Sequence, residues 1–235
     1  MRILITAGPT REYFDTVRFL SNPSSGKMGY ALARAAVRRG HDVVLVSGPV
    51  ALRPPRGARL IRVTTAAEMA AAGKQAFTRV DAAIMTAAVC DYRPAARVMH
   101  KLKKASRPLH VRLEPTEDIA ASLGRRKGRR LLIGFAMEDH HHRRFAAEKL
   151  ARKRCDAIVL NGPGNIGADR AEVEILVAGH DWIGPWRGSK LSIATRIIRL
   201  TEQLGSETSG KRSAETRRRT PRCRATGRPP HDRRS

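Results

Sequence analysis

Short apolar runs alternate with segments of helical periodicity along most of the chain. The apolar runs predict buried strands over residues 3–6, 42–46, 60–63, 81–89, 131–135 and 157–160. The segments between them predict helices over residues 30–39, 66–76, 116–123 and 143–154. Residues 109–113 alternate and predict an edge strand or hairpin arm. Strands that alternate with helices indicate an α/β fold with a doubly wound, Rossmann-like and mostly parallel sheet.

The C-terminal part of the chain departs from this alternation. Residues 172–177 and a second arm near Trp182 predict a C-terminal β-hairpin, and an amphipathic helix follows over residues 190–204. Residues 206–235 are rich in Arg, Ser, Thr and Pro and contain no Ile, Leu, Val or aromatic residue, which predicts a disordered basic tail. We therefore expect a single domain over residues 1–205.

The loops that follow the predicted strands should meet at one edge of the sheet. The right-handed crossover rule places every strand-to-helix loop there. This edge collects residues 8–28, 47–49, 87–92, 135–139 and 161–162. Ligands of open α/β sheets bind beyond the carboxyl ends of the strands, so we expect the functional site among these loops.

The first of these loops offers the chemistry of phosphate binding. Ser25 and Gly26 place backbone N–H groups at a helix N-terminus, where the helix dipole favours an anion, and Lys27 and Arg18 add positive charge. The loop is not a Walker A motif, because Met28 follows the lysine, and it lacks the glycine fingerprint of dinucleotide sites. A Gly/Ser turn that only caps the helix is the alternative interpretation.

Two later segments also carry candidate ligand groups. Ala87, Ala88 and Val89 end the most apolar strand with small side chains that admit a flat ring, and Asp91 follows in a position suited to a ribose or a metal ion. The run Lys101–Lys104 offers point charges for a triphosphate. An exposed strand end and a solvated charge run are the alternative interpretations.

Lys149 and Lys153 lie four residues apart and therefore on one face of a predicted helix. With Phe135 at the preceding strand end they would frame a nucleotide, its ring against Phe135 and its phosphates or ribose near the lysines. Exposed lysines without a specific role are the alternative. The adjacent histidines 140–142 cannot all face one ion, so we expect no structural zinc there.

Composition limits the class of protein but does not choose its ligand. The net charge is +25, from 46 Lys and Arg against 21 Asp and Glu, which favours anionic ligands without separating nucleotides from nucleic acids. A genome rich in Arg codons would produce the same excess. Three cysteines without CxxC spacing, no signal-peptide pattern and no apolar run of membrane-spanning length predict a reduced, cytoplasmic protein without membrane contact. Cys90 has no His near it in sequence, so we interpret it as a buried thiol.

A series of short motifs is more specific than any single segment. They are Thr6–Glu12 (TAGPTRE), Asp15–Gly29 (DTVRFLSNPSSGKMG), Val44–Pro49 (VLVSGP), Thr65–Met69 (TAAEM), Ala87–Tyr92 (AAVCDY), Lys101–Lys104 (KLKK), Asp118–Ile119, Gly134–Ala136 (GFA), Lys149–Lys153 and Asp156–Asn161. In order and spacing they resemble the phosphopantothenate–cysteine ligase family, the synthetase half of the bacterial bifunctional coenzyme A biosynthesis flavoproteins. The resemblance covers residues 1 to about 204.

The resemblance implies an enzyme that joins 4′-phosphopantothenate and cysteine in coenzyme A biosynthesis. Such an enzyme activates the carboxylate with CTP, which gives an acyl-cytidylate and pyrophosphate, and the cysteine amine then displaces CMP. By resemblance, Asn22 would handle the acyl-cytidylate and its oxyanion, Lys101 would be catalytic, and Arg18 would contact the charged groups of the substrate. The implied CTP site comprises Ser25, Gly26, Lys27, Ala87, Ala88, Val89, Asp91, Glu117, Asp118, Ile119, Ala120, Phe135, Lys149 and Lys153.

The resemblance also implies a cofactor and partners. Asp91 would hold Mg²⁺ beside the triphosphate, and the protein would form a homodimer. No flavin-binding half precedes Met1, so we expect a stand-alone ligase without flavin, with a separate phosphopantothenoylcysteine decarboxylase as a candidate partner. Thr116 and Glu117 stand where the family usually has Asn-Pro, so the CTP contacts there are expected to differ.

Two other functions remain open on the sequence. The first is an NAD(P)-binding Rossmann oxidoreductase, which the missing glycine fingerprint and the missing ribose carboxylate disfavour. The second is a basic nucleic-acid-binding module, which rests on the charge and the tail. Only ten Phe, Trp and Tyr residues occur in the chain, too few for interleaved stacking platforms.

Overall fold

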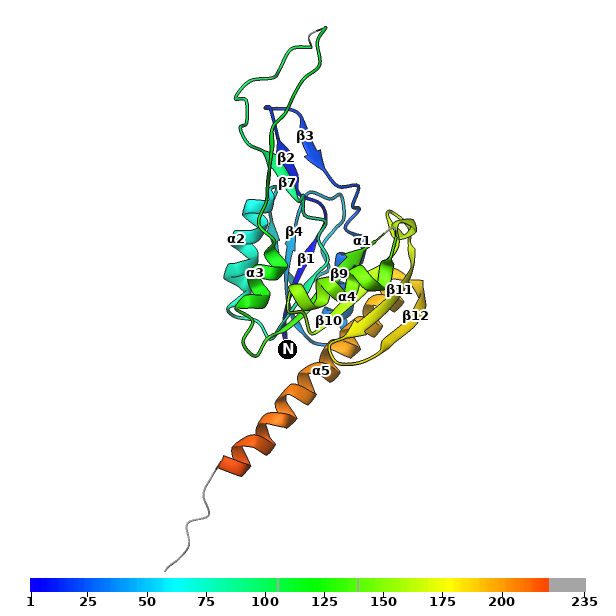
Figure 1. Cartoon of the computed structure of the whole chain (residues 1–235). Coiled ribbons are helices and arrows are strands. Elements are labelled where there is room, and N and C mark those ends of the chain that lie inside the picture. Colours follow the sequence, from blue (N-terminus) through cyan, green and yellow to red (C-terminus); the bar gives the residue numbers. More distant parts are fainter. Residues whose placement is uncertain (105, 139, 220–235) are drawn as a thin grey trace, which may run out of the picture.

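One eight-stranded sheet organises the computed structural model, which describes residues 1–104, 106–138 and 140–219, with backbone only from residue 208 onward. Its strands are β1 (Arg2–Ala7), β4 (Asp42–Ser47), β5 (Ala58–Arg62), β6 (Ala82–Met85), β9 (Leu131–Met137), β10 (Ala157–Asn161), β11 (Arg170–Val177) and β12 (Trp182–Ser189). Their order across the sheet is β12-β11-β10-β9-β6-β1-β4-β5 (Figure 1).

The sheet has Rossmann order. From β5 to β10 all neighbours are parallel, and β1 lies between β4 and β6. The chain therefore winds outward from β1 in one direction and then from β6 in the other, which makes the gap beyond β1 and β6 the topological switch point. β11 and β12 add an antiparallel hairpin to the β10 edge. The predicted Rossmann-like sheet and C-terminal hairpin are both confirmed.

Helices cover both faces of the sheet. α1 (Lys27–Arg38) and α5 (Lys190–Arg219) pack against one face, and α2 (Ala66–Phe77), α3 (Ile119–Arg125) and α4 (His142–Arg152) against the other. Alternation along β1 feeds both cores, because Ile3 and Ile5 face α1 whereas Leu4 faces α2. Among the residues that the structure describes, no helix is both long and apolar enough to cross a membrane.

An arm built from two short ribbons extends from the carboxyl edge of the sheet (Figure 1). One ribbon pairs β2 (Arg11–Tyr13) with β3 (Phe19–Ser21), and the other pairs β7 (Tyr92–Pro94) with β8 (Leu113–Pro115). The connection between β7 and β8 forms the tip of the arm. The sequence patterns did not predict β2 or β3, and the edge strand expected over residues 109–113 begins only at its last residue.

Several helices and strands begin or end at other residues than the sequence predicted. The strand expected over residues 81–89 ends at Met85, because the chain beyond it leaves the ladder to line the sheet edge. The helix expected from residue 116 begins at Ile119, since the Asp118 side chain caps it there. Residues 206–219, which were expected to begin the disordered tail, continue α5 as a helix. The rest of the predicted tail, residues 220–235, lies outside the described residues.

The N-terminus of α2 shows how sequence and tertiary contacts combine in one cap. Thr65 and Glu68 have capping-box spacing, and the Glu68 N–H donates to Thr65 Oγ1 at 3.2 Å. The Glu68 carboxylate accepts from the Thr64 N–H at 2.7 Å. Glu12 on β2, which is buried, accepts from the Ala66 N–H at 2.7 Å. The last bond fixes the base of the arm to the helix layer.

Replacement of Gly29 by Ala should destabilise the fold. An added Cβ would lie 2.5 Å from the Cβ of Ala7 and 2.7 Å from Oγ1 of Thr86, so α1 would have to move away from β1. We expect Gly29→Ala to lower the free energy of unfolding by about 1–3 kcal/mol, as overpacking does. Urea denaturation measures this. Gly162→Ala is the matched control, because a Cβ there meets nothing within 4 Å, and equal loss in both variants would contradict the account.

Candidate functional site

A cavity of about 470 Å³ lies at the switch point, beyond the carboxyl ends of β1, β6, β9 and β10. Its walls come from the loop before α1, the segment after β6, the start of α3, the end of β9, α4 and the loop between β10 and β11. Predicted site residues that line it are Asn22, Ser25, Gly26, Lys27, Ala87, Ala88, Val89, Asp91, Glu117, Asp118, Ile119, Ala120, Phe135, Lys149 and Lys153. The folded chain therefore brings together residues that are far apart in sequence, at the edge where the loops were expected to meet.

Hydrogen bonds join the segment after β1 to the segment after β6 along the cavity floor. Thr86 Oγ1 donates to the Thr6 carbonyl at 2.6 Å, and the Ala88 N–H donates to the Gly8 carbonyl at 2.9 Å. The Asn22 amide nitrogen donates to the carbonyls of Ala88 and Val89 at 3.2 and 3.1 Å. Asn22 thus fastens the loop before α1 to the end of the β6 segment.

These contacts bear on the expected role of Asn22. Its amide hydrogens are directed at two backbone carbonyls, and among the described residues no hydrogen bond holds its amide oxygen. To donate to an oxyanion the side chain would have to leave one of those carbonyls. The oxyanion role stays a prediction, and the structure adds a positioning role.

The loop before α1 presents backbone donors to the cavity. Gly26 is the N-cap residue and adopts φ 73°, a left-handed conformation that glycine reaches without strain. The first-turn N–H groups from Lys27 to Gly29 have no partner within the helix, as at every helix start. The hydroxyls of Ser24 and Ser25 accept only long hydrogen bonds of 3.4 and 3.5 Å from Gly26 and Lys27. The loop therefore has the form of an anion site.

A basic wall formed by Lys149 and Lys153 of α4 faces this loop across the cavity. Burial lowers the pKa of Lys149, and the neighbouring Lys153 ammonium lowers it further. Asp91, Asp118 and Glu138 act in the opposite direction on the same amine. Lys153 Nζ lies 3.0 Å from Asp118 Oδ1. An anionic ligand here would raise the pKa of Lys149 by adding a negative partner.

The start of α3 supplies carboxylates that are already engaged. Asp118 Oδ1 accepts from the Ala121 N–H at 3.0 Å and so caps α3. Burial raises the pKa of Asp118, but this hydrogen bond and the Lys153 ammonium outweigh it, and the pKa lies below its ordinary value. Glu117 turns toward α2, where it accepts from Lys74 Nζ at 2.6 Å, and that hydrogen bond lowers its pKa.

Two predicted site residues lie outside the cavity. Arg18 and Lys101 belong to the arm, and neither lines the cavity wall. Arg18 Nη1 lies 3.3 Å from Oδ2 of Asp15, a fully buried carboxylate that also accepts from the Leu102 N–H at 3.3 Å. Asp15 therefore ties the Arg18 turn to the Lys101–Lys104 run, and the expected roles of Arg18 and Lys101 stay predictions.

The sequence patterns missed the wall formed by the β10–β11 loop and the start of α5. Asn165, Gly167 and Lys190 line the cavity, and Lys27 Nζ donates to the Gly167 carbonyl at 2.7 Å. Lys190 is buried and donates from Nζ to the Asn165 carbonyl at 2.9 Å. Asn165 and Gly167 follow β10, and Lys190 follows the hairpin, so no local pattern marks them as part of a site built around the first loop.

The donor set of the cavity fits a magnesium ion that is bound mainly by its ligand. Asp91 lies exposed on the wall, and Mg²⁺ is commonly held by one or two carboxylates together with substrate phosphates. No group of three or more His, Cys, Asp or Glu residues suited to a metal occurs in the described part of the chain. Cys90 is buried against the Thr10 carbonyl, and burial raises the pKa of its thiol, as expected for a structural cysteine.

These features place the chain in the class of Rossmann-like α/β proteins with a basic ligand cavity at the switch point. Within that class, residues 1–204 match the family model described as the DNA/pantothenate metabolism flavoprotein C-terminal domain, and the chain belongs to this family. The family that the motifs resemble is thereby confirmed.

Curated relatives carry this domain within longer proteins. The coenzyme A biosynthesis bifunctional protein CoaBC of Bacillus subtilis (strain 168) is 43% identical over 218 residues, which are 90% of this chain and 53% of that protein. A cysteine/cysteine sulfinic acid decarboxylase from an unknown prokaryotic organism is 48% identical over 169 residues, 71% of this chain and 47% of that protein. The chain spans about half the length of the curated relatives it matches.

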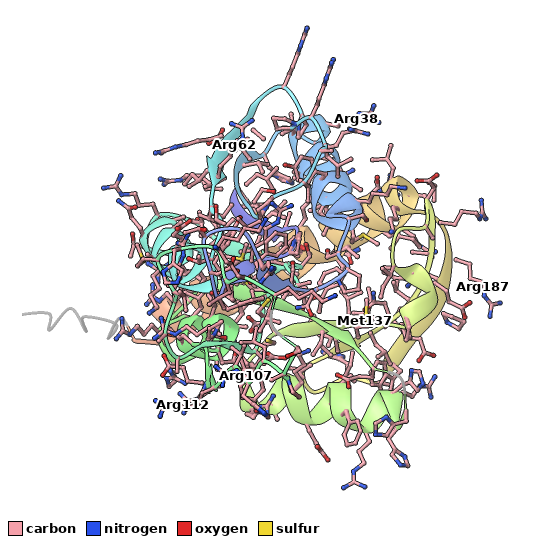
Figure 2. All side chains as sticks on the ribbon, turned by 90° about the horizontal axis from the view of Figure 1, so that it is seen from above. Arg38, Arg62, Arg107, Arg112, Met137 and Arg187 are labelled. Carbon is pink, nitrogen blue, oxygen red and sulfur yellow. The ribbon has the colours of Figure 1, made fainter. Side chains whose placement is uncertain are left out.

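Solved structures match the fold. The C-terminal domain of coenzyme A biosynthesis bifunctional protein CoaBC superposes with a TM-score of 0.76 at 39% identity, covering 88% of this chain and 96% of that one. A Cab2 variant in complex with phosphopantothenate-cysteine has a TM-score of 0.75 at 16% identity, covers 88% of each chain and shares the fold. The family match disfavours the oxidoreductase and the nucleic-acid-binding module. In Figure 2, Arg38, Arg112 and Arg187 lie toward different sides of the molecule.

Removal of the Asp118 carboxylate should separate its two contacts. Asp118→Asn keeps an amide oxygen for the Ala121 N–H but loses the ion pair with Lys153, so we expect a loss of less than about 1 kcal/mol. Asp118→Ala loses the cap as well and should cost about 1 kcal/mol more. Urea unfolding at neutral pH measures both.

The same pair gives a pH dependence with a defined sign. The folded-state pKa of Asp118 lies below its ordinary value of 3.8, so its contribution to stability is present above that pH and is lost as the pH falls through the lowered value. The stability gap between the native chain and Asp118→Asn should therefore close in acid. A gap that stays constant from pH 7 to about pH 3 would contradict the ion pair.

Proposed function

We propose that this chain is a phosphopantothenate–cysteine ligase, which forms 4′-phosphopantothenoylcysteine for coenzyme A biosynthesis. The observation that carries the proposal is the cavity, where a helix N-terminus and the lysines of α4 face each other across a partly apolar floor. The matched relatives include coenzyme A biosynthesis proteins, and a neighbour of the same fold was solved in complex with phosphopantothenate-cysteine. The chain corresponds to nearly the full C-terminal domain of CoaBC.

The activation step joins the substrate carboxylate to the α-phosphorus of CTP. A carboxylate oxygen attacks that phosphorus, the bond to the bridging oxygen breaks, and pyrophosphate leaves with the electron pair. Positioning and charge neutralisation dominate such a step. The α1 N-terminus and Lys27 neutralise the phosphates, Lys149 and Lys153 neutralise charge on the opposite wall, and Phe135 offers a ring face to the base. Mg²⁺, held at Asp91, would add charge neutralisation at the phosphates.

The second step forms the amide. The cysteine amine attacks the acyl carbon, the bond from that carbon to the CMP oxygen breaks, and the ammonium that forms loses a proton to solvent. The Asn22 amide and the backbone around Ala88 lie at the reacting end of the cavity, and an amide hydrogen released from the Val89 carbonyl would meet the developing oxyanion. CTP rather than ATP is the proposed nucleotide on the family resemblance, with the contacts of Thr116 and Glu117 particular to this chain.

The arm supports a homodimer. Val17, Tyr92, Met99 and Leu109 expose 54%, 56%, 78% and 59% of their surfaces, a concentration of apolar side chains on a protruding element. Arg18 and Lys101 lie on the same arm and outside the cavity of their own chain. We propose that the arm of one subunit carries Arg18 and Lys101 to the cavity of its partner, where both would contact anionic groups.

The partner reaction is the removal of the cysteine carboxylate from the product. The curated relatives are about twice as long as the matched segment, and their names include a bifunctional protein and a decarboxylase. We propose that a phosphopantothenoylcysteine decarboxylase acts next, either as a separate protein or as a fused half. The ligase chain itself is proposed to need no flavin.

The reaction is testable with the purified protein. Incubation with phosphopantothenate, cysteine, Mg²⁺ and each nucleoside triphosphate in turn should release pyrophosphate fastest with CTP. Lys153→Gln should slow release by about 10²–10³-fold, since it removes a charge that stabilises the transition state. Arg144→Gln, which removes an exposed charge of α4 outside the cavity, is the matched control. Absence of pyrophosphate with every nucleotide would refute the function.

Subunit mixing tests the arm. Arg18→Ala and Asn22→Ala should each be inactive, but a mixture that exchanges subunits contains hybrids in which one site is intact. Recovery of about a quarter of native activity is expected, since half the dimers are hybrids and each has one intact site of two. No recovery on mixing, with subunit exchange verified by mass spectrometry of labelled chains, would place Arg18 in its own cavity.

A further inference from the structure

The Lys27 ammonium is not directed at open space in this structure. Its Nζ lies 2.7 Å from Asp169 Oδ1 and 2.7 Å from the Gly167 carbonyl oxygen. Lys27 belongs to the loop that forms the anion end of the cavity, and Gly167 belongs to the opposing wall. One lysine thus spans the cavity mouth and is neutralised by a carboxylate of the same chain.

The two partners of this ion pair differ in their surroundings. The Lys27 side chain is 35% exposed, whereas that of Asp169 is 89% exposed. Asp169 can therefore turn fully into solvent with little further change in its hydration. Its backbone stays fixed during such a turn, because the Lys190 N–H donates to the Asp169 carbonyl at 2.9 Å. Rotation of one side chain releases the lysine, with no opening of the loop.

A second lysine makes this end of the cavity more attractive to an anion. Lys190 lies buried behind the loop, and within the described part of the chain the charges that act on its ammonium are those of Lys27 and Asp169. When Asp169 turns away, two ammonium groups remain without that carboxylate. A polyphosphate is the ligand that supplies several negative charges to such a pair while also reaching the α1 N-terminus.

We propose that Asp169 is an internal competitor for the anion end of the cavity, holding Lys27 until the polyphosphate of a nucleotide replaces its carboxylate. The inference deepens the proposed ligase function and rests on it for the identity of the nucleotide. The competition lowers affinity for partial ligands such as inorganic phosphate. It also keeps Lys27 oriented in the unliganded protein.

Calorimetric titration with inorganic tripolyphosphate tests the competition without requiring catalysis. Asp169→Asn removes the competing charge and should bind tripolyphosphate about fivefold more tightly at low ionic strength, the factor to which the upper range of exposed ion-pair strengths converts. The gain should shrink at high ionic strength, because salt screens exposed pairs. Glu172→Gln is the matched control: it removes the same charge from a carboxylate that pairs with Arg187 at 2.8 Å outside the cavity.

A second variant distinguishes competition from a general change in charge. In a Lys27→Gln background, Asp169→Asn should give a much smaller gain in affinity, since the directly paired lysine is gone and only the attraction between Asp169 and Lys190 remains. An equal gain in that background, or an equal gain in Glu172→Gln, would overturn the proposal. Weaker binding by Asp169→Asn would also overturn it, because Asp169 would then position Lys27 for the anion. Tripolyphosphate binding to none of the folded variants would refute the proposed phosphate site itself, and equal binding to all would refute the competition alone.

Discussion

The site depends on the hydrogen bonds that join the chain after β1 to the chain after β6. At a switch point the chain leaves the two neighbouring strands in opposite directions. The ends of β1 and β6 would therefore separate without hydrogen bonds between them. Thr86 and the Ala88 N–H supply it by bonding to the Thr6 and Gly8 carbonyls, and the Asn22 amide closes it from the loop before α1. Gly29 completes the arrangement because only a residue without Cβ lets α1 lie this close to Ala7. The cavity floor is therefore built largely from backbone, and its shape tolerates few changes.

The charged side chains around the cavity fall into two groups. On one side they are already paired within the chain, and on the other side lysines can still pair with a ligand. On the α3 side, Lys153 is paired with Asp118 and Glu117 is paired with Lys74. Lys149 has no such close partner among the residues that the structure describes, and burial beside Lys153 lowers its pKa. At the opposite end Lys27 is held by an exposed carboxylate that can leave. A polyanion entering the cavity would meet one unpaired lysine and one exchangeable lysine, which together favour a ligand with charges at both ends of the site.

The sequence was most informative where one pattern decides the structure locally. Periodicity and the alternation of strands with helices were enough to predict the sheet, its hairpin and the edge where the loops meet. The residue types of the Ser25–Lys27 loop were enough to predict an anion site there. β2, β3 and β7 were missed because each is only three residues long and has no periodicity to detect, and β8 was predicted only in part. Gly167 was missed because it lies in an irregular loop after β10, and Lys190 because the hairpin at the far edge of the sheet separates it from the other site residues in sequence. Arg18 and Lys101 lie outside the cavity because buried Asp15, which looks like any exposed aspartate in sequence, draws their segments into the arm.

Hydrogen–deuterium exchange with and without CTP and Mg²⁺ tests the central claim most directly, because it locates the ligand without assuming a reaction. The account predicts slower exchange at the backbone amides of residues 24–29 and 86–91 and at the start of α3. Exchange at the opposite end of the sheet, around His41 and Arg130, should not change. Protection confined to that opposite end, or no protection near Gly26 and Ala88 at saturating CTP, would contradict a nucleotide site at the switch point.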